Sequence, residues 1–490
     1  MKRYECWFII GSQHLYGQET LDKVLDHGQT MVKDMNESME FPWEIKLKGI
    51  VKTSEEIVDI VRQANNDDSC AGIISWMHTF SPSKMWIRGL SLLDKPYLHF
   101  NTQFNKEIPW DEIDMDFMNL NQSAHGDREH GFIGARMRFP RKIIVGHWKD
   151  TQTRIELSDW MRSAIGYDVS RNLNIARFGD NMRDVAVTEG DKVEAQIKFG
   201  WSVNYYPISD LVEYIDSVKE SEVDSLYEEY LREYEIKTDN IASIRYQARL
   251  ELGMRRFLEE GNFQAFTTNF QDLHGLDQLP GLAVQRLMEA GYGFGAEGDW
   301  KTAGLTHIMK MMAIGLKGGT TFMEDYTYHV SEDTRAILGA HMLEICPSVA
   351  SGKKTIDVKT LDIGGKEAPA RLLFEGKEGP IILVSLVDMG GRMRMIVNEA
   401  VAIKPKYMPK LPVASVMWEP KPNLKTAINA WILAGGAHHT VVSYDLSVDQ
   451  IKTLADLFEI EMIVINDKTD LYELEKELRY NDIYWRLNRE

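Results

Sequence analysis

Two glutamates and a histidine within residues 291–346 could bind one divalent ion: Glu297, Glu324 and His341. Two carboxylates and an imidazole form a mixed oxygen and nitrogen set without a thiolate, which favours an ion such as Mn²⁺ over structural zinc. A fourth candidate lies far downstream, in the pair His438-His439. Four protein ligands would leave open positions on an octahedral ion for two adjacent substrate oxygens, as a sugar could supply.

Each of the first three candidates lies where a regular element is expected to begin or end. Glu297 lies in a glycine-rich turn before a helix that we expect from Asp299 to Ala313. Glu324 lies in a run of β-branched and aromatic residues that predicts a strand, and His341 opens a second short extended segment. Side chains at such positions can converge on one cleft.

The same region contains a pattern of a different class, because Gly293 to Gly298 fits the G-x-G-x-x-G motif of dinucleotide-binding folds. That motif must follow a strand. The preceding residues, Leu282 to Gly291, instead predict a helix that ends at glycine. This predicted helix, in the place where the motif requires a strand, argues against a nicotinamide dehydrogenase. A glutamate beside glycines is also often only an exposed loop residue, and a lone histidine is often structural.

Composition excludes several classes of protein. Of the 490 residues, 44% are hydrophobic and 27% charged, which is typical of a globular chain with two to four domains. The net charge of −18 argues against a nucleic-acid partner, which would require a basic surface. Three widely separated cysteines, the absence of a signal peptide and the absence of a long apolar run predict reduced thiols, a cytoplasmic location and no membrane span.

The first third alternates apolar strands with amphipathic helices, which predicts a doubly wound α/β domain over residues 1–172. Its strands are expected at Cys6–Ile10, Ile45–Val51, Ala71–Ser75, Pro96–Phe100 and Lys142–Gly146. In such sheets, polar residues just beyond the carboxyl ends of the strands face a cleft. That rule selects Gln13, His14, His78 and Gln103.

Residues 118–129 are rich in hydrogen-bonding side chains and contain no proline. One interpretation is the start of a helix with polar caps. The other is a loop that binds hydroxyl groups, since Gln, His and Asn suit a neutral polyol. The residues alone leave both interpretations open.

A second α/β domain is predicted over residues 173–317, beginning with a strand at Leu173–Phe178 and including a long helix over Ile241–Glu260. Beyond it, residues 318–490 predict a β-rich carboxy-terminal domain. Its expected strands are Arg371–Phe374, Ile381–Val387 and Arg392–Ile403, and the chain then returns to α/β character.

Long stretches of the sequence closely resemble the L-arabinose isomerase family, over nearly the whole chain. The stretches that carry the resemblance are Ile10–Gly17, Trp76–Pro82, Asp114–Gln122, Arg177–Arg183, Gly298–Lys301, Phe322–His329 and Ala434–Thr440. Stretches of this length, rich in Trp, Met and His, are far more specific than a short motif.

The resemblance implies a fold, a site and a set of partners. It implies three domains of fucose isomerase-like architecture, and hexamers or tetramers with active sites at subunit boundaries. It implies that one Mn²⁺ per subunit, with Co²⁺ as a possible substitute, is bound by Glu297, Glu324, His341 and His439. It also implies sugar contacts from Gln13, Leu15, Gln122, His125, Met182 and Phe270.

The activity that the resemblance implies is the interconversion of L-arabinose and L-ribulose, the first step of L-arabinose catabolism. The expected mechanism is metal-assisted proton transfer through an enediol, with Glu297 and Glu324 as the acid–base pair. A hydride shift remains a rival mechanism, and the sequence does not tell which glutamate is the base. Another aldose isomerase, of the fucose type for example, and a non-catalytic sugar-binding protein remain alternatives.

Overall fold

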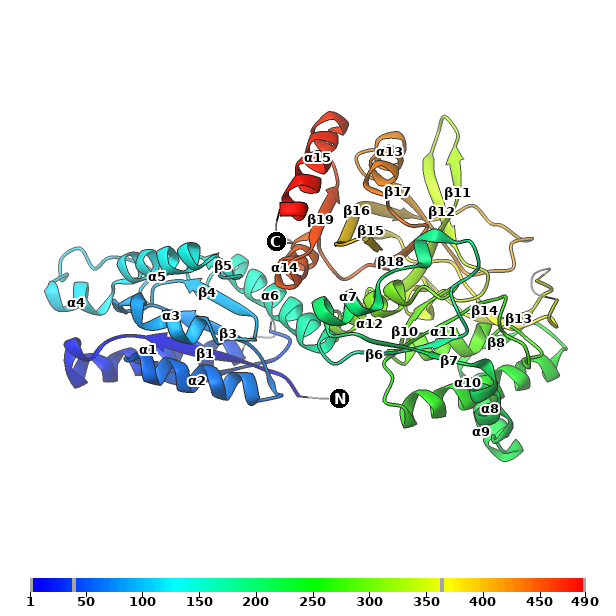
Figure 1. Cartoon of the computed structure of the whole chain (residues 1–490), viewed down its shortest axis with the longest axis horizontal. Coiled ribbons are helices and arrows are strands. Elements are labelled where there is room, and N and C mark those ends of the chain that lie inside the picture. The colour runs from blue at the N-terminus through cyan, green and yellow to red at the C-terminus, as the bar shows by residue number, and fades with distance from the viewer. Residues whose placement is uncertain (1–2, 38–40, 362–364, 488–490) are drawn as a thin grey trace. The chain divides into compact units, whose positions relative to one another are not determined.

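A computed structural model describes residues 3–37, 41–361 and 365–487 of the chain, and these divide into two compact units (Figure 1). Unit 1 comprises residues 1–168 together with 449–457. Unit 2 comprises residues 169–448 together with 458–490. No helix within the described residues is long and apolar enough to cross a membrane.

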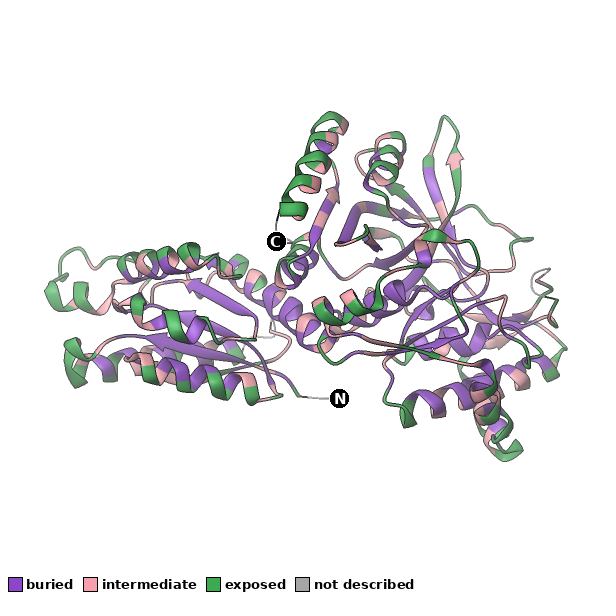
Figure 2. Cartoon of the chain, in the orientation of Figure 1, coloured by how far each residue is buried: buried purple, intermediate pink, exposed green. Residues whose placement is uncertain are grey.

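Unit 1 is built on a five-stranded parallel sheet in the order β2-β1-β3-β4-β5. This order confirms the predicted doubly wound α/β arrangement. The three central strands are almost wholly buried, the two edge strands are partly exposed, and helices cover the sheet (Figure 2). The strands are β1 (Glu5–Gly11), β2 (Glu44–Val51), β3 (Cys70–Trp76), β4 (Tyr97–Asn101) and β5 (Lys142–Val145). The helices are α1 (Gly17–Glu37), α2 (Ser54–Asn66), α3 (Ile87–Leu90), α4 (Met115–Leu120), α5 (Ser123–Met137) and α6 (Thr151–Ser170), with short 3₁₀ turns η1 (His14–Tyr16) and η2 (Ser83–Trp86).

A segment from the far end of the chain completes unit 1. Helix α14 (Val448–Phe458) contributes residues 449–457 to this unit. The side-chain amide of Gln450 donates to the Asp159 carboxylate at 2.7 Å, and the Ser163 hydroxyl donates to the Gln450 carbonyl at 2.9 Å. Both of these partners lie on α6, so α14 is joined to that helix by specific hydrogen bonds.

Unit 2 contains a four-stranded parallel sheet in the order β10-β9-β6-β7, as the second predicted α/β region requires. Its strands are β6 (Asn174–Phe178), β7 (Ser202–Tyr206), β9 (Ala265–Thr268) and β10 (Gly293–Gly295). Its helices are α7 (Lys192–Phe199), α8 (Ile208–Asp216), α9 (Glu220–Glu233), α10 (Ile241–Glu260), α11 (Gly281–Glu289) and α12 (Trp300–Met312), with the short turn η3 (Ala186–Thr188).

The glycines of the apparent dinucleotide motif have a packing role. Gly293 and Gly295 form strand β10 rather than the expected turn, and α12 lies directly on that strand. A Cβ on Gly293 would lie 2.2 Å from the Ala303 carbonyl oxygen, and one on Gly295 would lie 2.3 Å from that of Asp299. Glycine is therefore needed here for the close approach of a helix.

The β-rich part of unit 2 is a mixed sheet that closes on itself. Its order is β15-β18-β11-β12-β17-β16, and β16 pairs again with β15, so six antiparallel strands form a barrel-like sheet. Strand β19 (Glu461–Ile465) adds to β16 in parallel. The barrel strands are β11 (Thr320–Val330), β12 (Arg335–Ala340), β15 (Gly379–Asp388), β16 (Met393–Ile403), β17 (Ser415–Pro420) and β18 (His439–Ser443).

Short elements complete unit 2. A small sheet in the order β14-β13-β8 joins β8 (Glu235–Ile236), β13 (Thr355–Val358) and β14 (Ala370–Leu373), and η4 spans Pro347–Val349. Helices α13 (Leu424–Ala434) and α15 (Leu471–Leu487) lie toward the end of the chain. One apolar core connects the two sheet systems, because Phe322 of β11 packs with Phe266 of β9 and Phe294 of β10.

Candidate metal centre

Strand register in the barrel brings three of the predicted ligands together. Glu324 on β11 lies directly opposite His439 on β18, so their side chains emerge on the same face of the sheet. On its other side Glu324 lies opposite Ala340, the last residue of β12, and His341 follows at once. The prediction that His341 opens a strand is wrong, because it instead begins the turn after one.

The reason for that turn is a local hydrogen bond. The Glu344 carboxylate lies 2.5 Å from Nδ1 of His341 and also accepts from the backbone N–H of Leu343 at 3.0 Å. All three residues are buried. The apolar residues that predicted a strand therefore serve a compact turn that is held by one inward-pointing carboxylate.

Glu297 reaches the same region from the turn between β10 and α12. Its φ is 60° and that of Gly298 is 80°, so the backbone has two consecutive left-handed residues. Only glycine fits at the second of them, where a Cβ would lie 2.5 Å from the Cα of Asn181. This turn directs Glu297 toward the barrel strands, and Asp299 caps α12 by accepting from the Thr302 N–H.

The predicted ligands form two carboxylate–imidazole pairs. Glu297 Oε2 lies 3.8 Å from Nε2 of His439, and Glu324 Oε2 lies 3.8 Å from Nε2 of His341. His438 joins the first pair at 3.7 Å from Glu297. In the part of the chain that the structure describes, Glu297, His438 and His439 are the one set whose ligand atoms all lie within 4.8 Å of one another.

Both imidazoles are oriented by a buried carboxylate on the side away from the glutamates. Glu344 binds Nδ1 of His341, and Asp299 Oδ2 lies 3.2 Å from Nδ1 of His439. A proton on each Nδ1 leaves the Nε2 lone pair free, which is the arrangement of metal-binding histidines. Nε2 of His439 is buried and has no hydrogen-bond partner among the described residues, so this donor set fits a cation.

The charges of the site reinforce each other. Burial raises the pKa of Glu297, but pairing with His438 and the charges of His439 and His341 outweigh it and hold the pKa below its usual range. Burial lowers the pKa of His341, but Glu344 outweighs it and the pKa is raised. The environment therefore favours the ionised form of Glu297, and a proton on the His341 imidazole would compete with a metal ion.

The two predicted sugar-contact residues of unit 2 lie beside this site. The Phe270 ring stacks on that of His341 with centroids 5.8 Å apart, and the Met182 N–H donates to the Glu297 carbonyl at 2.9 Å. Phe322 lies edge-on to both His341 and His439, at 5.1 and 5.2 Å between centroids. The site thus has an apolar wall beside its charged groups.

The other predicted sugar-contact residues gather in unit 1, beyond the carboxyl ends of β1 and β3. The Gln122 amide donates to the Tyr16 hydroxyl at 3.1 Å, and His125 lies 3.1 Å from Gln122 Oε1 and stacks on Phe80. Gln13 and Leu15 belong to the same corner, at the start of η1 and within it. Residues 118–129 are mostly helical, with α4 and α5 meeting at Gln122.

One residue expected to face a cleft is buried instead. Nε2 of His78 lies 2.8 Å from Nδ1 of His27, and its ring stacks on Trp76. The His78 carbonyl accepts from the Gln122 N–H at 2.9 Å. His78 therefore holds the segment that carries Gln122 through its backbone carbonyl, while its side chain is buried.

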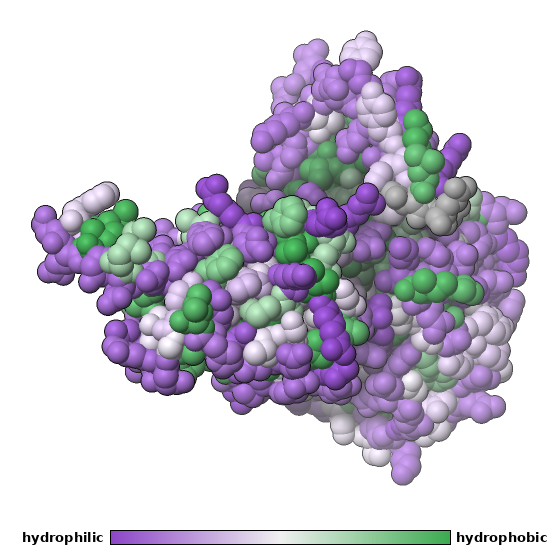
Figure 3. Space-filling view, turned by 60° about the vertical axis from the view of Figure 1, so that its left-hand side comes forward, coloured by the Kyte–Doolittle hydropathy of each residue, from purple (hydrophilic) through white to green (hydrophobic). Residues whose placement is uncertain are grey.

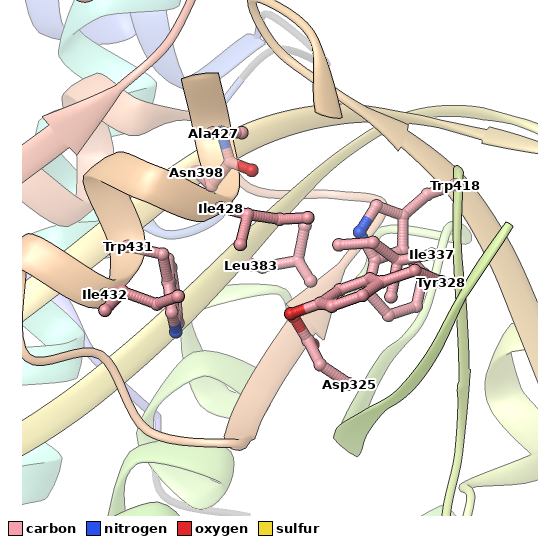
Figure 4. A pocket seen from close by; sticks show the side chains of 10 residues that line it. All are labelled: Asp325, Tyr328, Ile337, Leu383, Asn398, Trp418, Ala427, Ile428, Trp431 and Ile432. Carbon is pink, nitrogen blue, oxygen red and sulfur yellow. The ribbon is translucent and has the colours of Figure 1, made fainter. Parts of the chain in front are cut away.

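The strand that carries Glu324 also borders a separate cavity of about 30 Å³ (Figure 4). Asp325 projects from β11 into it, toward a wall that includes Tyr328, Trp418 and Trp431. Burial and the neighbouring charge of Glu324 raise the pKa of Asp325 to about 7. The adjacent residues Glu324 and Asp325 therefore differ: Glu324 pairs with an imidazole of the candidate metal centre, whereas Asp325 belongs to neither carboxylate–imidazole pair.

Sequence reasoning missed two residues of the site, Asp299 and Glu344, and it selected His439 over His438 only through the family resemblance. Weak signals existed, since Asp299 precedes a helix as a cap would and Glu344 follows His341 by three residues. His438 was noticed only as the neighbour of His439. Nothing in the sequence pairs Asp299 with His439, because their contact depends on the tertiary fold.

Fold and site together define a protein with two parallel α/β sheets, a barrel-like sheet and a candidate metal centre of carboxylates and imidazoles. Three family models match the chain: the L-arabinose isomerase N-terminal domain at residues 1–172, the central domain at 174–315 and the C-terminal domain at 319–461. The chain belongs to the L-arabinose isomerase family.

Named relatives are similar over their full length. The L-arabinose isomerase of Geobacillus stearothermophilus is 56% identical over 493 residues, covering 99% of either chain. Those of Thermotoga neapolitana and Thermotoga maritima are 56% and 55% identical over 490 residues, again with 99% of either chain covered. The predicted domain limits of 172 and 317 and the four-ligand set remain predictions.

Proposed function

We propose that this chain interconverts L-arabinose and L-ribulose as an aldose–ketose isomerase. Full-length identity to relatives named for that activity supports the substrate. The observation that carries the chemistry is the pair of imidazoles, each anchored at Nδ1 with Nε2 toward a glutamate. A fucose isomerase-like architecture and a cytoplasmic location belong to the same proposal.

Glu297, Glu324, His341 and His439 would hold one Mn²⁺ per subunit, with Co²⁺ as a substitute. A bound divalent ion would polarise the carbonyl of an open-chain aldose and acidify the C2 proton. The unpartnered Nε2 of His439 and the carboxylate oxygens near it support this donor set. His438 is a further candidate for the same site, because it lies within the one described group of three donors.

The chain's own carboxylates would move the proton. One of Glu297 and Glu324 takes the C2 proton of the sugar and returns it to C1. The other acts as the acid–base group for the O1 and O2 oxygens. Each is only partly buried, with side-chain exposures of 15% and 19%, so both can meet a substrate. The stacked Phe270 and the nearby Met182 would border the sugar on its apolar side.

We further propose that the chain acts as a homo-oligomer, a hexamer or alternatively a tetramer, with no nucleic-acid or membrane partner. Gln13, Leu15, Gln122 and His125 would then complete a neighbouring subunit's sugar site. Figure 3 shows hydrophobic residues exposed among the hydrophilic residues of the surface. In unit 1 the exposed apolar residues include Leu15, Trp110, Met115 and Met118, and the first of these belongs to the sugar-contact set.

The test is ketose formation from a panel of aldoses, with and without Mn²⁺. Chelator-treated protein should lose activity on L-arabinose and regain it with Mn²⁺. Bound Mn²⁺ should also raise Tm, because it binds the folded state selectively. Full activity of metal-free protein would overturn the metal assignment, and preference for another aldose would overturn the substrate.

A further inference from the structure

Lys301, in the first turn of α12, has a fully buried ammonium group. Its Nζ donates to the carbonyl oxygens of Thr188 at 2.9 Å and Glu189 at 2.6 Å, and lies 3.3 Å from Asp299 Oδ1. The ammonium therefore donates two hydrogen bonds to backbone carbonyls and forms an ion pair with the Asp299 carboxylate. These buried acceptors hold the group in place.

On one side the ammonium meets the carboxylate that orients a proposed ligand. Asp299 is buried, and its two oxygens divide their work: Oδ1 faces Lys301, whereas Oδ2 faces Nδ1 of His439 at 3.2 Å. The Thr302 hydroxyl also donates to Oδ2, at 2.7 Å. Lys301 is thus the cation that balances this buried carboxylate. Without a paired cation, burial of the Asp299 charge would carry a large desolvation cost.

On the other side the ammonium holds the segment 181–189. Besides the two carbonyls bound by Lys301, this segment is fastened by the Asn181 amide, which donates to the carbonyls of Thr188 at 2.6 Å and Gly298 at 3.2 Å. The Met182 N–H binds the Glu297 carbonyl. The segment that carries Met182 is therefore fixed near both of its ends, by the Glu297 turn at residues 181 and 182 and by Lys301 at residues 188 and 189.

We propose that Lys301 is a positioning residue that couples the metal-facing imidazole of His439 to the segment carrying Met182. The coupling runs from His439 through Asp299 to the ammonium, and from the ammonium to the Thr188 and Glu189 carbonyls. It rests on the proposed function, since it assigns Lys301 a role in both metal and sugar binding. Loss of the ammonium would remove the donor to the Glu189 carbonyl and one of the two donors to the Thr188 carbonyl, and it would leave the buried Asp299 carboxylate without its cation.

The variant that tests the coupling is Lys301→Met, which keeps the packing of the stem and removes the charge. Mn²⁺ binding is measured by calorimetry without sugar, and KM for L-arabinose is measured at saturating Mn²⁺. We expect the Mn²⁺ Kd to rise about 10-fold or more, as for loss of a residue that supports a ligand, and KM to rise as well. Unchanged values of both would overturn the inference.

Lys377→Met is a matched control in the same unit. The Lys377 ammonium also donates to three backbone carbonyls, those of Lys317, Gly318 and Ser348, at 2.7 to 3.0 Å. Its loss should lower Tm but leave the Mn²⁺ Kd and KM unchanged. An equal loss of Mn²⁺ affinity in both variants would reduce Lys301 to a general stabilising residue.

The double variant Asp299→Asn/Lys301→Met tests the route. If Lys301 acts through Asp299, the double variant should bind Mn²⁺ no more weakly than Asp299→Asn alone; additive losses would contradict the route. If Lys301→Met does not fold, Asp299→Asn alone must raise both Kd and KM, and a native KM would contradict the coupling. Failure of the wild-type protein to bind Mn²⁺ or form ketose would instead reject the proposed function.

Discussion

Buried and partly buried histidines in the two units have pKa values shifted in opposite directions. In unit 1 burial lowers the pKa of His27, and it lowers those of His78 and His130 well below the usual value. In unit 2 the pKa of His341 is raised because Glu344 outweighs its burial, and pairing with Glu297 raises that of His438. The difference lies in the neighbours, since His27 and His78 face each other, whereas His341 and His438 face carboxylates.

The comparison separates structural histidines from candidate ligands without reference to sequence motifs. A neutral histidine that contacts another histidine or an aromatic ring completes the packing of a core. A histidine held between two carboxylates occupies a place where positive charge is favourable, and a divalent ion satisfies that preference better than a proton. His307 shows that the contrast concerns neighbours and not units, because burial lowers its pKa to about 4 within unit 2.

The largest expected effect comes from removing charge at the carboxylates that face the ligand histidines. Glu297→Gln and Glu324→Gln should each lower kcat on the order of 10²-fold or more, because an amide cannot carry the proton. Steady-state kinetics with Mn²⁺ binding measured in parallel will show this. Glu378→Gln, at an exposed position of the same unit, is the control. Near-native turnover in a variant that binds Mn²⁺ normally would remove that glutamate from proton transfer.

The second effect concerns pH and metal binding. The pKa of His341 is raised, so at a pH below that pKa Mn²⁺ must displace a proton from the imidazole. The apparent Kd for Mn²⁺ should therefore rise about tenfold for each pH unit by which the pH falls, for each proton displaced. Calorimetry from pH 5.5 to 8 measures this. Glu344→Gln should lower the pKa of His341 and move the dependence to lower pH. An affinity independent of pH over this range would contradict the assignment of His341.

The third effect is a partial recovery of activity on subunit mixing. His125→Ala and Glu324→Gln are each expected to be inactive, and mixed assemblies should regain some complete sites if unit 1 serves a neighbouring subunit. For random dimeric exchange about half of the dimers are mixed with one complete site each, which gives roughly a quarter of native activity. Mixing confirmed by mass without any recovery would place His125 in its own subunit's site or outside the site.

The smallest effect should come from the histidine pair of unit 1. The folded-state pKa of His27 lies below its unfolded value of 6.5, so the unfolded chain binds more protons and stability falls as pH drops through 6.5. His27→Gln should reduce this loss, raising Tm relative to the wild-type protein by about 1–3 °C more at pH 5 than at pH 7.5. An identical pH dependence in the two proteins would show that His27 does not contribute.

Periodicity predicted most of the regular elements. The apolar runs of unit 1 and the long helix Ile241–Glu260 form as expected, because buried strands and amphipathic helices have strong local patterns. The start of α2 shows such a local signal, because the Thr53 hydroxyl accepts from the Glu56 N–H and the Glu56 carboxylate accepts from the Lys52 N–H. Strand β10 was missed because its glycines show no alternation and are fixed by the approach of α12.

The candidate ligands could be proposed from residue types and family resemblance, but their orientation could not. Register across β12, β11 and β18 places Glu324 opposite His439 and beside the strand end that His341 follows, and register is a property of the sheet. The anchoring of His439 by Asp299 joins residues 140 positions apart. Such contacts have no local signal, because each side chain alone fits many surroundings.

The position of α14 in unit 1 has a consequence for synthesis on the ribosome. Residues 159 and 163 of α6 bind Gln450, which is translated almost 300 residues later. At translation rates of about 5–20 residues per second, the amino-terminal unit waits roughly 15–60 s for its last helix. During that time the surface of α6 that α14 will cover is open to other chains. A fragment that ends near residue 168 would keep that surface exposed permanently, so a self-contained amino-terminal fragment needs α14 joined to it.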